Sequence, residues 1–563
     1  MLRGAACKCV AQRRLAKTHI RSIATSSVTF TSQSQTQTQT SSTGAVDEFN
    51  AIVTRPPLKS SSPASPQSES YERLPLEGLT LSIKQNFLTS SMPTTASSQM
   101  LLANFQPHFD ASPVRLLRQA GAQIVGKTNC DEFGMGSANV NSVYGAVVNP
   151  AGPGGTRRTR RRRVAGGSSG GAAAAARMGY SDLSLASDTG GSIRLPASYC
   201  GVWGLKPSYG LVSRWGLISY ADSLDTVGLL GRELEDVIGG FGVLDRVDGR
   251  DPTAVGRRYR DRAAAAARER LEQIGKGRAG SRTLDGLVIG VPREYFPAEL
   301  SAGVVDAVRK TLRKLKQAGA TLRSVSLPHT DRSLGAYYVL ASAEATSNLA
   351  RYDGIQYGFR KEGDPNDLAA GEHPYAATRS EGFGAEVQKR ILLGTYALSA
   401  GAYDNYFLKA QKIRRLVQAD FDRVFSIPNV LRQHHRDDED SPDARGTMAE
   451  DRSLGVDVLI HPSAVGIAPL LPEAEAEAEA GANFESTSGK AKNAGATSYV
   501  QDVLTVPASL AGLPALSMPV GESTGAGGAS EEAGWPIGVS VVAQWGCEEL
   551  LWTVARHVTS LQQ

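Results

Sequence analysis

Two stretches of this chain alternate between strand-like and helix-like patterns, and this alternation restricts the possible folds more than any other feature. In the first, a helix over residues 112–121, which opens with Ser-Pro and closes with Gly, precedes a buried strand over 123–126. In the second, strands over 287–291 and 321–325 flank an amphipathic helix over 304–315. A strand–helix–strand unit joins parallel strands. The sequence therefore predicts an α/β fold with a mixed, mostly parallel central sheet covered by helices on both faces.

The remaining chain is long and apolar enough to enclose a large core. It has 563 residues, of which 41% are hydrophobic. A long helical stretch is predicted over 387–425, followed near the C-terminus by a strand over 537–543 and a helix from Glu548. No window of about 18 apolar residues occurs, which excludes a membrane-spanning helix. The five cysteines include no CxxC pair, so neither a disulfide scaffold nor a zinc ribbon is predicted.

The positive charge is confined to two short segments. The formal net charge is +5, but residues 1–46 hold six basic and no acidic side chains, and the rest of the chain has 55 basic and 56 acidic ones. The second basic segment is an arginine run at 157–163. A protein coated for nucleic-acid binding carries a broader basic surface. The run is interpreted as a solvated loop, with a contact to a partner or to tRNA as the alternative.

Residues 1–46 have the composition of an organellar transit peptide. They are rich in Arg, Ser and Thr and end in a Ser-Gln-Thr-Gln tract at 32–39. Arginine outnumbers lysine, which favours the mitochondrion over the chloroplast, and an ordinary disordered tail is the alternative. The folded domain is then predicted over 47–563. Insertions are predicted near 151–165, 429–454 and 470–490; a His-His pair beside acids in the second is read as a solvated loop rather than a metal site.

Two motifs match nucleotide- and ester-processing signatures in letters but not in context. Residues 121–128 satisfy the P-loop pattern GxxxxGK[ST], yet a helix precedes them and their middle is apolar, whereas a P-loop follows a strand. Residues 166–170 satisfy the G-x-S-x-G elbow of α/β-hydrolases, yet arginines rather than a buried strand precede them. Neither motif is therefore assigned its usual function.

The chemistry is concentrated in a glycine- and serine-rich stretch at 166–206. It contains two Gly-Gly-Ser units, at 166–168 and 190–192, whose backbone can approach a ligand and turn its N–H groups inward. A serine nucleophile needs a base. None of the eight histidines lies in a motif-like setting, whereas Lys84 lies inside an apolar, strand-like run at 81–86, where a charge is costly.

These residues together resemble the amidase signature family, whose members hydrolyse amides with a Ser–cis-Ser–Lys triad. The resemblance extends from about residue 75 to the C-terminus and implies one large domain. It implies that Ser192 is the acylated nucleophile, Ser168 the bridging serine on a cis peptide bond, and Lys84 the base. The oxyanion hole is then expected from the segment Asp188, Thr189, Gly190 and Gly191. Asp188 and Arg194 are expected to pair and hold this loop, and Cys200 to be buried.

Three further segments, at 131–137, 345–349 and 394–401, are similar to the glutamine-hydrolysing subunits of glutamyl-tRNA(Gln) amidotransferases within this family. The resemblance implies that the chain releases ammonia in the mitochondrial matrix and binds no cofactor or metal itself. A partner, the B subunit, would use ATP and Mg to convert Glu-tRNA(Gln) to Gln-tRNA(Gln), and a small third subunit would complete the complex. The tRNA would be held mainly by the partner, and no membrane association is expected.

Glutamine is a zwitterion, so its site should present one cation and one anion. The resemblance implies that Arg390 binds the α-carboxylate, to which a bidentate guanidinium is suited, and that Asp502 binds the α-ammonium. Tyr337 is the matching pocket tyrosine, with Tyr338 adjoining it. Two alternatives stay open: a stand-alone amidase acting on another small carboxamide, and a non-enzymatic scaffold or basic binding protein.

Overall fold

The computed structural model shows residues Asp47–Gln563 as one compact unit. The residues that it describes are 47–56, 73–152, 162–275, 283–361, 375–432, 455–471, 501–524 and 533–560. The predicted targeting segment, the predicted insertion at 470–490 apart from its first two residues, and most of the insertion at 429–454 lie outside these ranges. In the described part of the chain, no helix has the length and apolarity needed to cross a membrane.

The centre of the unit is a mixed sheet of eleven described strands, in the order β1-β3-β2-β4-β6-β5-β10-β11-β9-β7-β8. The strands are β1 (Ile52–Thr54), β2 (Thr80–Lys84), β3 (Gln123–Thr128), β4 (Leu183–Asp188), β5 (Trp203–Lys206), β6 (Thr226–Gly231), β7 (Val288–Pro292), β8 (Thr321–Val325), β9 (Val458–Pro462), β10 (Ala515–Glu522) and β11 (Pro536–Ala543).

The prediction that the sheet is mostly parallel is wrong in that detail. Strand β2 runs parallel to β3 and β4, and β7 runs parallel to β8 and β9, but the six other pairings among the described strands are antiparallel. The parallel pairs β2–β3 and β7–β8 are the units that helices connect in sequence. Two antiparallel pairs, β5–β6 and β10–β11, join consecutive strands. The pairs β4–β6, β5–β10 and β9–β11 join strands that are not consecutive, so local patterns do not reveal their direction.

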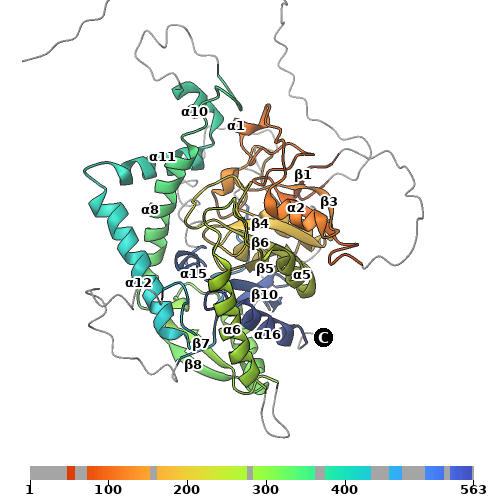
Figure 1. Ribbon diagram of the computed structural model, residues 1–563, viewed down its shortest axis with the longest axis vertical. Helices are drawn as coiled ribbons and strands as arrows, with labels where there is room; N and C mark the ends of the chain where they lie inside the picture. The colour runs from red at the N-terminus through yellow and green to blue at the C-terminus, as the bar shows by residue number, and fades with distance from the viewer. Residues whose placement is uncertain are drawn as a thin grey trace, which may run out of the picture. The chain divides into compact units, whose positions relative to one another are not determined.

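Helices cover both faces of the sheet, as predicted (Figure 1). The described helices are α1 (Gln99–Leu102), α2 (Ser112–Gln119), α3 (Gly170–Arg177), α4 (Arg194–Cys200), α5 (Leu234–Leu244), α6 (Arg257–Gln273), α7 (Ala302–Gln317), α8 (Thr330–Leu349), α10 (Ala376–Gly382), α11 (Ala385–Leu398), α12 (Lys409–Val424), α15 (Val506–Ala511) and α16 (Glu548–Ser560), with the short turns η1 (Glu132–Gly134), η2 (Arg293–Tyr295) and η3 (Asp404–Leu408).

Strand β4 shows how the two faces divide. The side chain of Leu183 packs beside Gly240 of α5, whereas the hydroxyl of the next residue, Ser184, donates to the carbonyl of Ala172 in α3. Successive side chains of a strand point to opposite faces. Helices α3 and α5 therefore lie on opposite faces of the sheet. Beyond them, α8 packs against α11, α12 and α15 as a separate helical group (Figure 1).

Most elements with a clear sequence pattern form where predicted. The helix over 112–121 and the strand that follows it are α2 and β3, and the strand–helix–strand unit from 287 to 325 is β7, α7 and β8. The predicted continuous helix over 387–425 is wrong. The chain leaves the helix at Ser399, whose ψ is 149°, and re-enters through η3 into α12. A Ser-Ala-Gly sequence at 399–401 follows α11, where glycine weakens helical continuity.

The P-loop pattern lies in a structural context that argues against its usual function. Residues 123–128 of the P-loop pattern are strand β3. The buried amine of Lys127 donates to Phe87 O, Pro93 O and Thr94 Oγ1, so it does not point into a phosphate-binding loop.

Of the arginine run, Arg162 and Arg163 are described. Arg163 is buried, donates to Ala468 O and lies 4.9 Å from the centre of the Trp535 ring.

Candidate active site

Lys84 is the last residue of β2 and has no exposed surface. Strand β2 lies between β3 and β4, so its end is enclosed by the sheet on both sides. Taking an ammonium group out of water favours its neutral form. Burial therefore lowers the pKa of Lys84, while the nearby Cys130, Asp131, Asp188 and Asp225 oppose the change.

The amine of Lys84 is surrounded by serine hydroxyls. It is 2.8 Å from Ser168 Oγ, 2.8 Å from Ser169 Oγ and 3.1 Å from Ser187 Oγ. The peptide bond between Gly167 and Ser168 is cis. The structure thus brings the predicted base and the predicted bridging serine into hydrogen-bond contact, although they are 84 positions apart in the chain.

Small residues allow the Ser168 loop to lie this close to the sheet. A Cβ atom on Gly167 would be 2.2 Å from Asp131 Oδ2, and one on Gly171 would be 2.4 Å from Asn129 O, so neither position has room for a side chain. The carboxylate of Asp131 also accepts the N–H groups of residues 139–141. Helix α3, whose alanines are all buried, begins directly after the loop. Tight packing against α3 and Asp131 therefore fixes the position of Ser168.

Ser192 lies just before α4, and its hydroxyl makes no hydrogen bond within the described residues. Its backbone carbonyl accepts from Ser169 N at 3.2 Å, which places the two serine loops side by side. The predicted pair of Asp188 and Arg194 is confirmed: Arg194 Nη2 is 2.8 Å from Asp188 Oδ1, and both side chains are buried. Arg194 also donates to Thr505 O at 2.6 Å. Cys200 is buried, as predicted.

The segment predicted to form the oxyanion hole has free donors and close neighbours. The N–H groups of Thr189, Gly190 and Gly191 donate to no group in the described part of the chain. A Cβ atom on Gly190 would be 2.5 Å from the ring of Tyr337, and one on Gly191 would be 2.2 Å from Thr505 Oγ1. Glycine therefore lets two elements approach the backbone beside Ser192, and free N–H groups there can bind an oxyanion.

Arg390 on α11 is buried and held by two side chains. Its Nε donates to Glu386 at 2.8 Å, and its Nη1 donates to the Tyr220 hydroxyl at 2.6 Å. Its Nη2 makes no hydrogen bond within the described ranges. The guanidinium carbon is 5.4 Å from the ring centre of Tyr338. Arg390 is thus oriented, and one of its nitrogens is available to an anion.

Asp502, on the segment before α15, supplies a buried carboxylate that also contacts Tyr338. It accepts from Ser137 Oγ at 2.6 Å and from the Tyr338 hydroxyl at 3.0 Å. Burial raises the pKa of Asp502 to about 6, and these hydrogen bonds and Arg390 counteract the rise. Of the two adjacent tyrosines, Tyr337 packs on the Gly190 backbone, whereas Tyr338 contacts both ionic side chains.

Some residues that complete the site were missed in the sequence. Ser169 and Ser187 contact the Lys84 amine, and Asn86 Nδ2 donates to Ser187 Oγ at 2.9 Å. Tyr220 accepts a hydrogen bond from Arg390, and Asp225 accepts one from Thr189. Ser169 and Ser187 flank the predicted serine and aspartate in the same glycine-rich stretch, which was a usable signal. No local pattern marks Tyr220 or Asp225.

A protein-family model described as Amidase matches residues 38–552. This chain belongs to the amidase family. The resemblance predicted from the Gly-Gly-Ser units and Lys84 is therefore confirmed, and the chain is an amidase-type enzyme.

The amidase is similar to curated relatives over most of its length. It is 48% identical over 519 residues to the mitochondrial glutamyl-tRNA(Gln) amidotransferase A subunit of Mycosarcoma maydis, covering 92% of this chain and 88% of the relative. The protein of the same name from Tuber melanosporum is 42% identical, with 91% and 92% covered. The crystal structure of the glutamyl-tRNA(Gln) amidotransferase A subunit from Thermotoga maritima matches with a TM-score of 0.59 and 32% identity, covering 86% of this chain and 83% of that one.

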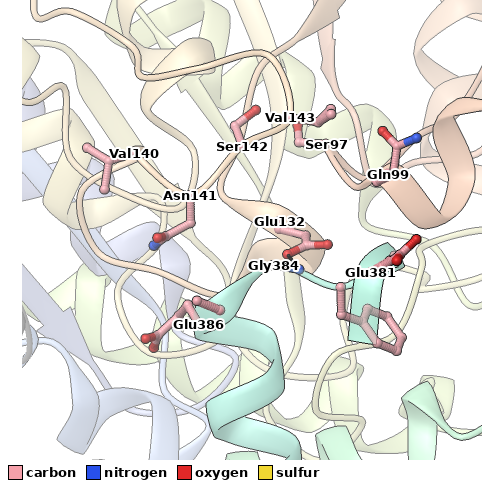
Figure 2. A pocket seen from close by; sticks show the side chains of 13 residues that line it. Ser97, Gln99, Glu132, Val140, Asn141, Ser142, Val143, Glu381, Gly384 and Glu386 are labelled. Atoms are coloured by element: carbon pink, nitrogen blue, oxygen red, sulfur yellow. Dashed lines mark hydrogen bonds between the residues drawn. The ribbon is translucent and has the colours of Figure 1, made fainter. Parts of the chain in front are cut away.

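A pocket of about 350 Å³ lies at the start of α11 in this amidase, and three glutamates line it. Figure 2 shows Glu132 beside Gly384, with Glu386, the partner of Arg390, in the first turn of α11. Glu132 accepts from Gly384 N at 2.8 Å and from Ser98 Oγ. Its carboxylate therefore ties η1 to the start of the helix that carries Arg390. Burial raises the pKa of Glu132 to about 7, against these two hydrogen bonds.

This raised pKa predicts a pH dependence of stability. The folded-state pKa of Glu132 lies above its unfolded value of about 4.3, so its contribution to stability is present below that value and is lost as pH rises through 7. The full contribution is roughly 3 kcal/mol, at about 1.4 kcal/mol per pKa unit. Glu132→Gln should therefore flatten the fall in thermal midpoint between about pH 5 and pH 8. Glu381→Gln, at a half-exposed position in the same pocket, is the control. Identical slopes for wild type and Glu132→Gln would contradict this assignment.

Proposed function

We propose that this amidase is the glutamine-hydrolysing A subunit of a mitochondrial glutamyl-tRNA(Gln) amidotransferase and releases ammonia from glutamine. The observation that carries the proposal is the pair of buried, opposite charges, Arg390 and Asp502, which both contact Tyr338. A free amino acid presents a carboxylate and an ammonium at a fixed separation, and a buried charge is stable only with a partner. Glutamine offers a carboxylate to Arg390 Nη2, which Glu386 and Tyr220 leave without a hydrogen bond in the described structure, an ammonium to Asp502, and a carboxamide to Ser192.

The hydrogen bond of Lys84 to Ser168 and the adjoining position of the Ser192 loop support a three-residue proton transfer. Neutral Lys84 accepts the Ser168 proton while Ser168 accepts the proton of Ser192, whose Oγ then bonds to the carboxamide carbon. The N–H groups of residues 189–191 stabilise the resulting oxyanion. When the C–N bond breaks, the same proton returns through Ser168 to the leaving nitrogen, and ammonia departs. A water molecule, deprotonated along the same route, hydrolyses the γ-glutamyl ester and releases glutamate.

The cellular role follows from the relatives named above. In the proposed complex, ammonia passes to a B subunit that uses ATP and Mg to convert Glu-tRNA(Gln) to Gln-tRNA(Gln), and a small third subunit completes the assembly. The proposal places no cofactor on this chain itself; among its described residues, no cluster of His, Cys, Asp and Glu is arranged to hold a metal ion. The relatives are named mitochondrial, and the basic, acid-free segment 1–46 supports import into the matrix.

Substrate preference tests the proposal against the stand-alone amidase. Arg390→Ala should lower kcat/KM for glutamine about 100-fold, because a charged hydrogen bond of about 2–3 kcal/mol is lost. Hydrolysis of butyramide, which has no carboxylate, should be unchanged. Ammonia release from both amides measures this in the complex assembled with its partner subunits.

The neighbouring Lys389→Ala, at an exposed position, is the matched control and should behave as wild type. A wild-type enzyme that prefers uncharged amides, with rates insensitive to Arg390→Ala, would refute glutamine as the substrate and favour the stand-alone amidase.

A further inference from the structure

The carboxylate-binding arginine and the oxyanion segment are connected by one loop, residues 219–225, that the mechanism above does not use. Asp225 at its end is buried. Its Oδ1 accepts from Thr189 Oγ1 at 2.7 Å, and its Oδ2 accepts from the N–H groups of Tyr220 and Ala221 at 2.8 and 3.0 Å. A single carboxylate therefore holds both the oxyanion segment and the backbone of Tyr220.

Tyr220 extends the connection to the substrate site. Its hydroxyl accepts from Arg390 Nη1 at 2.6 Å, and its ring centre is 5.7 Å from the guanidinium carbon. Because Arg390 Nε is fixed by Glu386, the Tyr220 hydroxyl determines which way Nη2 points. The contacts run without interruption from Thr189 through Asp225 and Tyr220 to Arg390.

The rest of the loop is fixed from outside, so it cannot absorb a shift at either end. Glu344 on α8 accepts from both Ser223 N and Ser223 Oγ, and Arg414 on α12 donates to Ser223 O at 2.7 Å. Asn348 on α8 donates to Tyr220 O at 3.2 Å. These contacts hold Tyr220 and Asp225 at a fixed spacing, so the Arg390 site and Thr189 keep one relative position.

We propose that Asp225, acting through Tyr220, is a positioning residue that couples binding of a substrate carboxylate at Arg390 to the placement of the oxyanion segment at Thr189. The same carboxylate thus places both the arginine that binds the substrate carboxylate and the segment that binds the oxyanion. This inference rests on the proposed function, because it takes Arg390 as the carboxylate site.

The test compares glutamine and butyramide in the assembled complex. Tyr220→Phe removes only the hydroxyl and should raise KM for glutamine about tenfold, with a smaller effect on butyramide, which has no carboxylate to bind. Asp225→Asn should lower kcat about tenfold for both amides and also raise KM for glutamine. Both residues act in one chain of contacts. The kcat/KM of the double variant for glutamine should therefore be at most about twofold lower than that of the less active single variant. Asp222→Asn, on the same loop but half-exposed, should resemble wild type.

A purely structural role for Asp225 would reduce the fraction of enzyme that forms an acyl-enzyme and leave KM for glutamine unchanged. An unchanged KM in Asp225→Asn therefore overturns the proposal. Multiplicative effects of the two substitutions on kcat/KM in the double variant also overturn it. If Asp225→Asn does not assemble, Thr189→Val removes the hydroxyl that binds the same carboxylate and takes its place in the cycle. A wild-type enzyme without preference for glutamine would instead refute the proposed function. Retained preference in Asp225→Asn refutes the coupling alone.

Discussion

Ser192→Ala is expected to abolish ammonia release from glutamine, with kcat lowered at least about 10⁴-fold, because no other group in the proposed mechanism can form the acyl bond. The Ser192 hydroxyl makes no hydrogen bond inside the described structure, so its loss leaves no buried partner unsatisfied. The variant should therefore fold and assemble normally. Intact-mass measurement after rapid quenching should detect a γ-glutamyl adduct on the wild-type chain and none on Ser192→Ala.

Ser181→Ala is the matched control. Ser181 is also buried, but its hydroxyl bonds to Ser82 and Ser184 instead of facing Lys84. This variant should retain both the adduct and the activity. An adduct of the same mass on Ser192→Ala, mapped to Ser168, would show that the roles of the two serines are exchanged.

Lys84→Met should lower kcat/KM for glutamine by about 10³- to 10⁴-fold, because it keeps the length of the side chain but removes the base. The wild-type rate should rise with pH through the lowered pKa of Lys84, since only the neutral amine accepts a proton and a fall in pH charges it. Lys84→Arg should be inactive at every pH, because a guanidinium stays protonated. Profiles of kcat/KM against pH measure all three.

Lys127→Met separates this role from the general cost of altering a buried lysine. The Lys127 amine is also fully buried but donates to Phe87, Pro93 and Thr94, away from the serines. Its replacement should lower thermal stability and leave the pH profile of the remaining activity unchanged. A Lys84→Met enzyme with the wild-type rate and pH profile would show that the base is a different group.

The parts of the fold that could be predicted are those in which one face of an element is buried. Helix α7 buries Val304, Val308 and Leu315 along a single side, so its periodicity is visible in the sequence. Helix α8 was not predicted because it is buried on several sides, among α11, α12 and α15. Such a helix shows no clear stripe of apolar residues, although it carries both site tyrosines.

The site divides in the same way. Lys84 and Ser168 were found because each lies in a distinctive local setting, and the family resemblance supplied the roles. The partners that orient the site are decided by tertiary contacts: Tyr220 reaches Arg390 across 170 positions, and Asp502 meets Ser137 across 365. No pattern within either segment encodes the other's position. Tyr220 was therefore found only in the folded chain, whereas Arg390 and Asp502 were predicted through the family resemblance.

The buried bond from Arg194 to Thr505 has a consequence for how this scaffold can diversify. Thr505 Oγ1 also donates to Gly190 O at 2.6 Å, and Thr505 N donates to Asp502 O at 3.1 Å. The loop before Ser192 and the segment that carries Asp502 are thus held together through Thr505. Relatives that accept a different substrate should therefore differ on α8 and α11, and keep the loops around Ser192 unchanged.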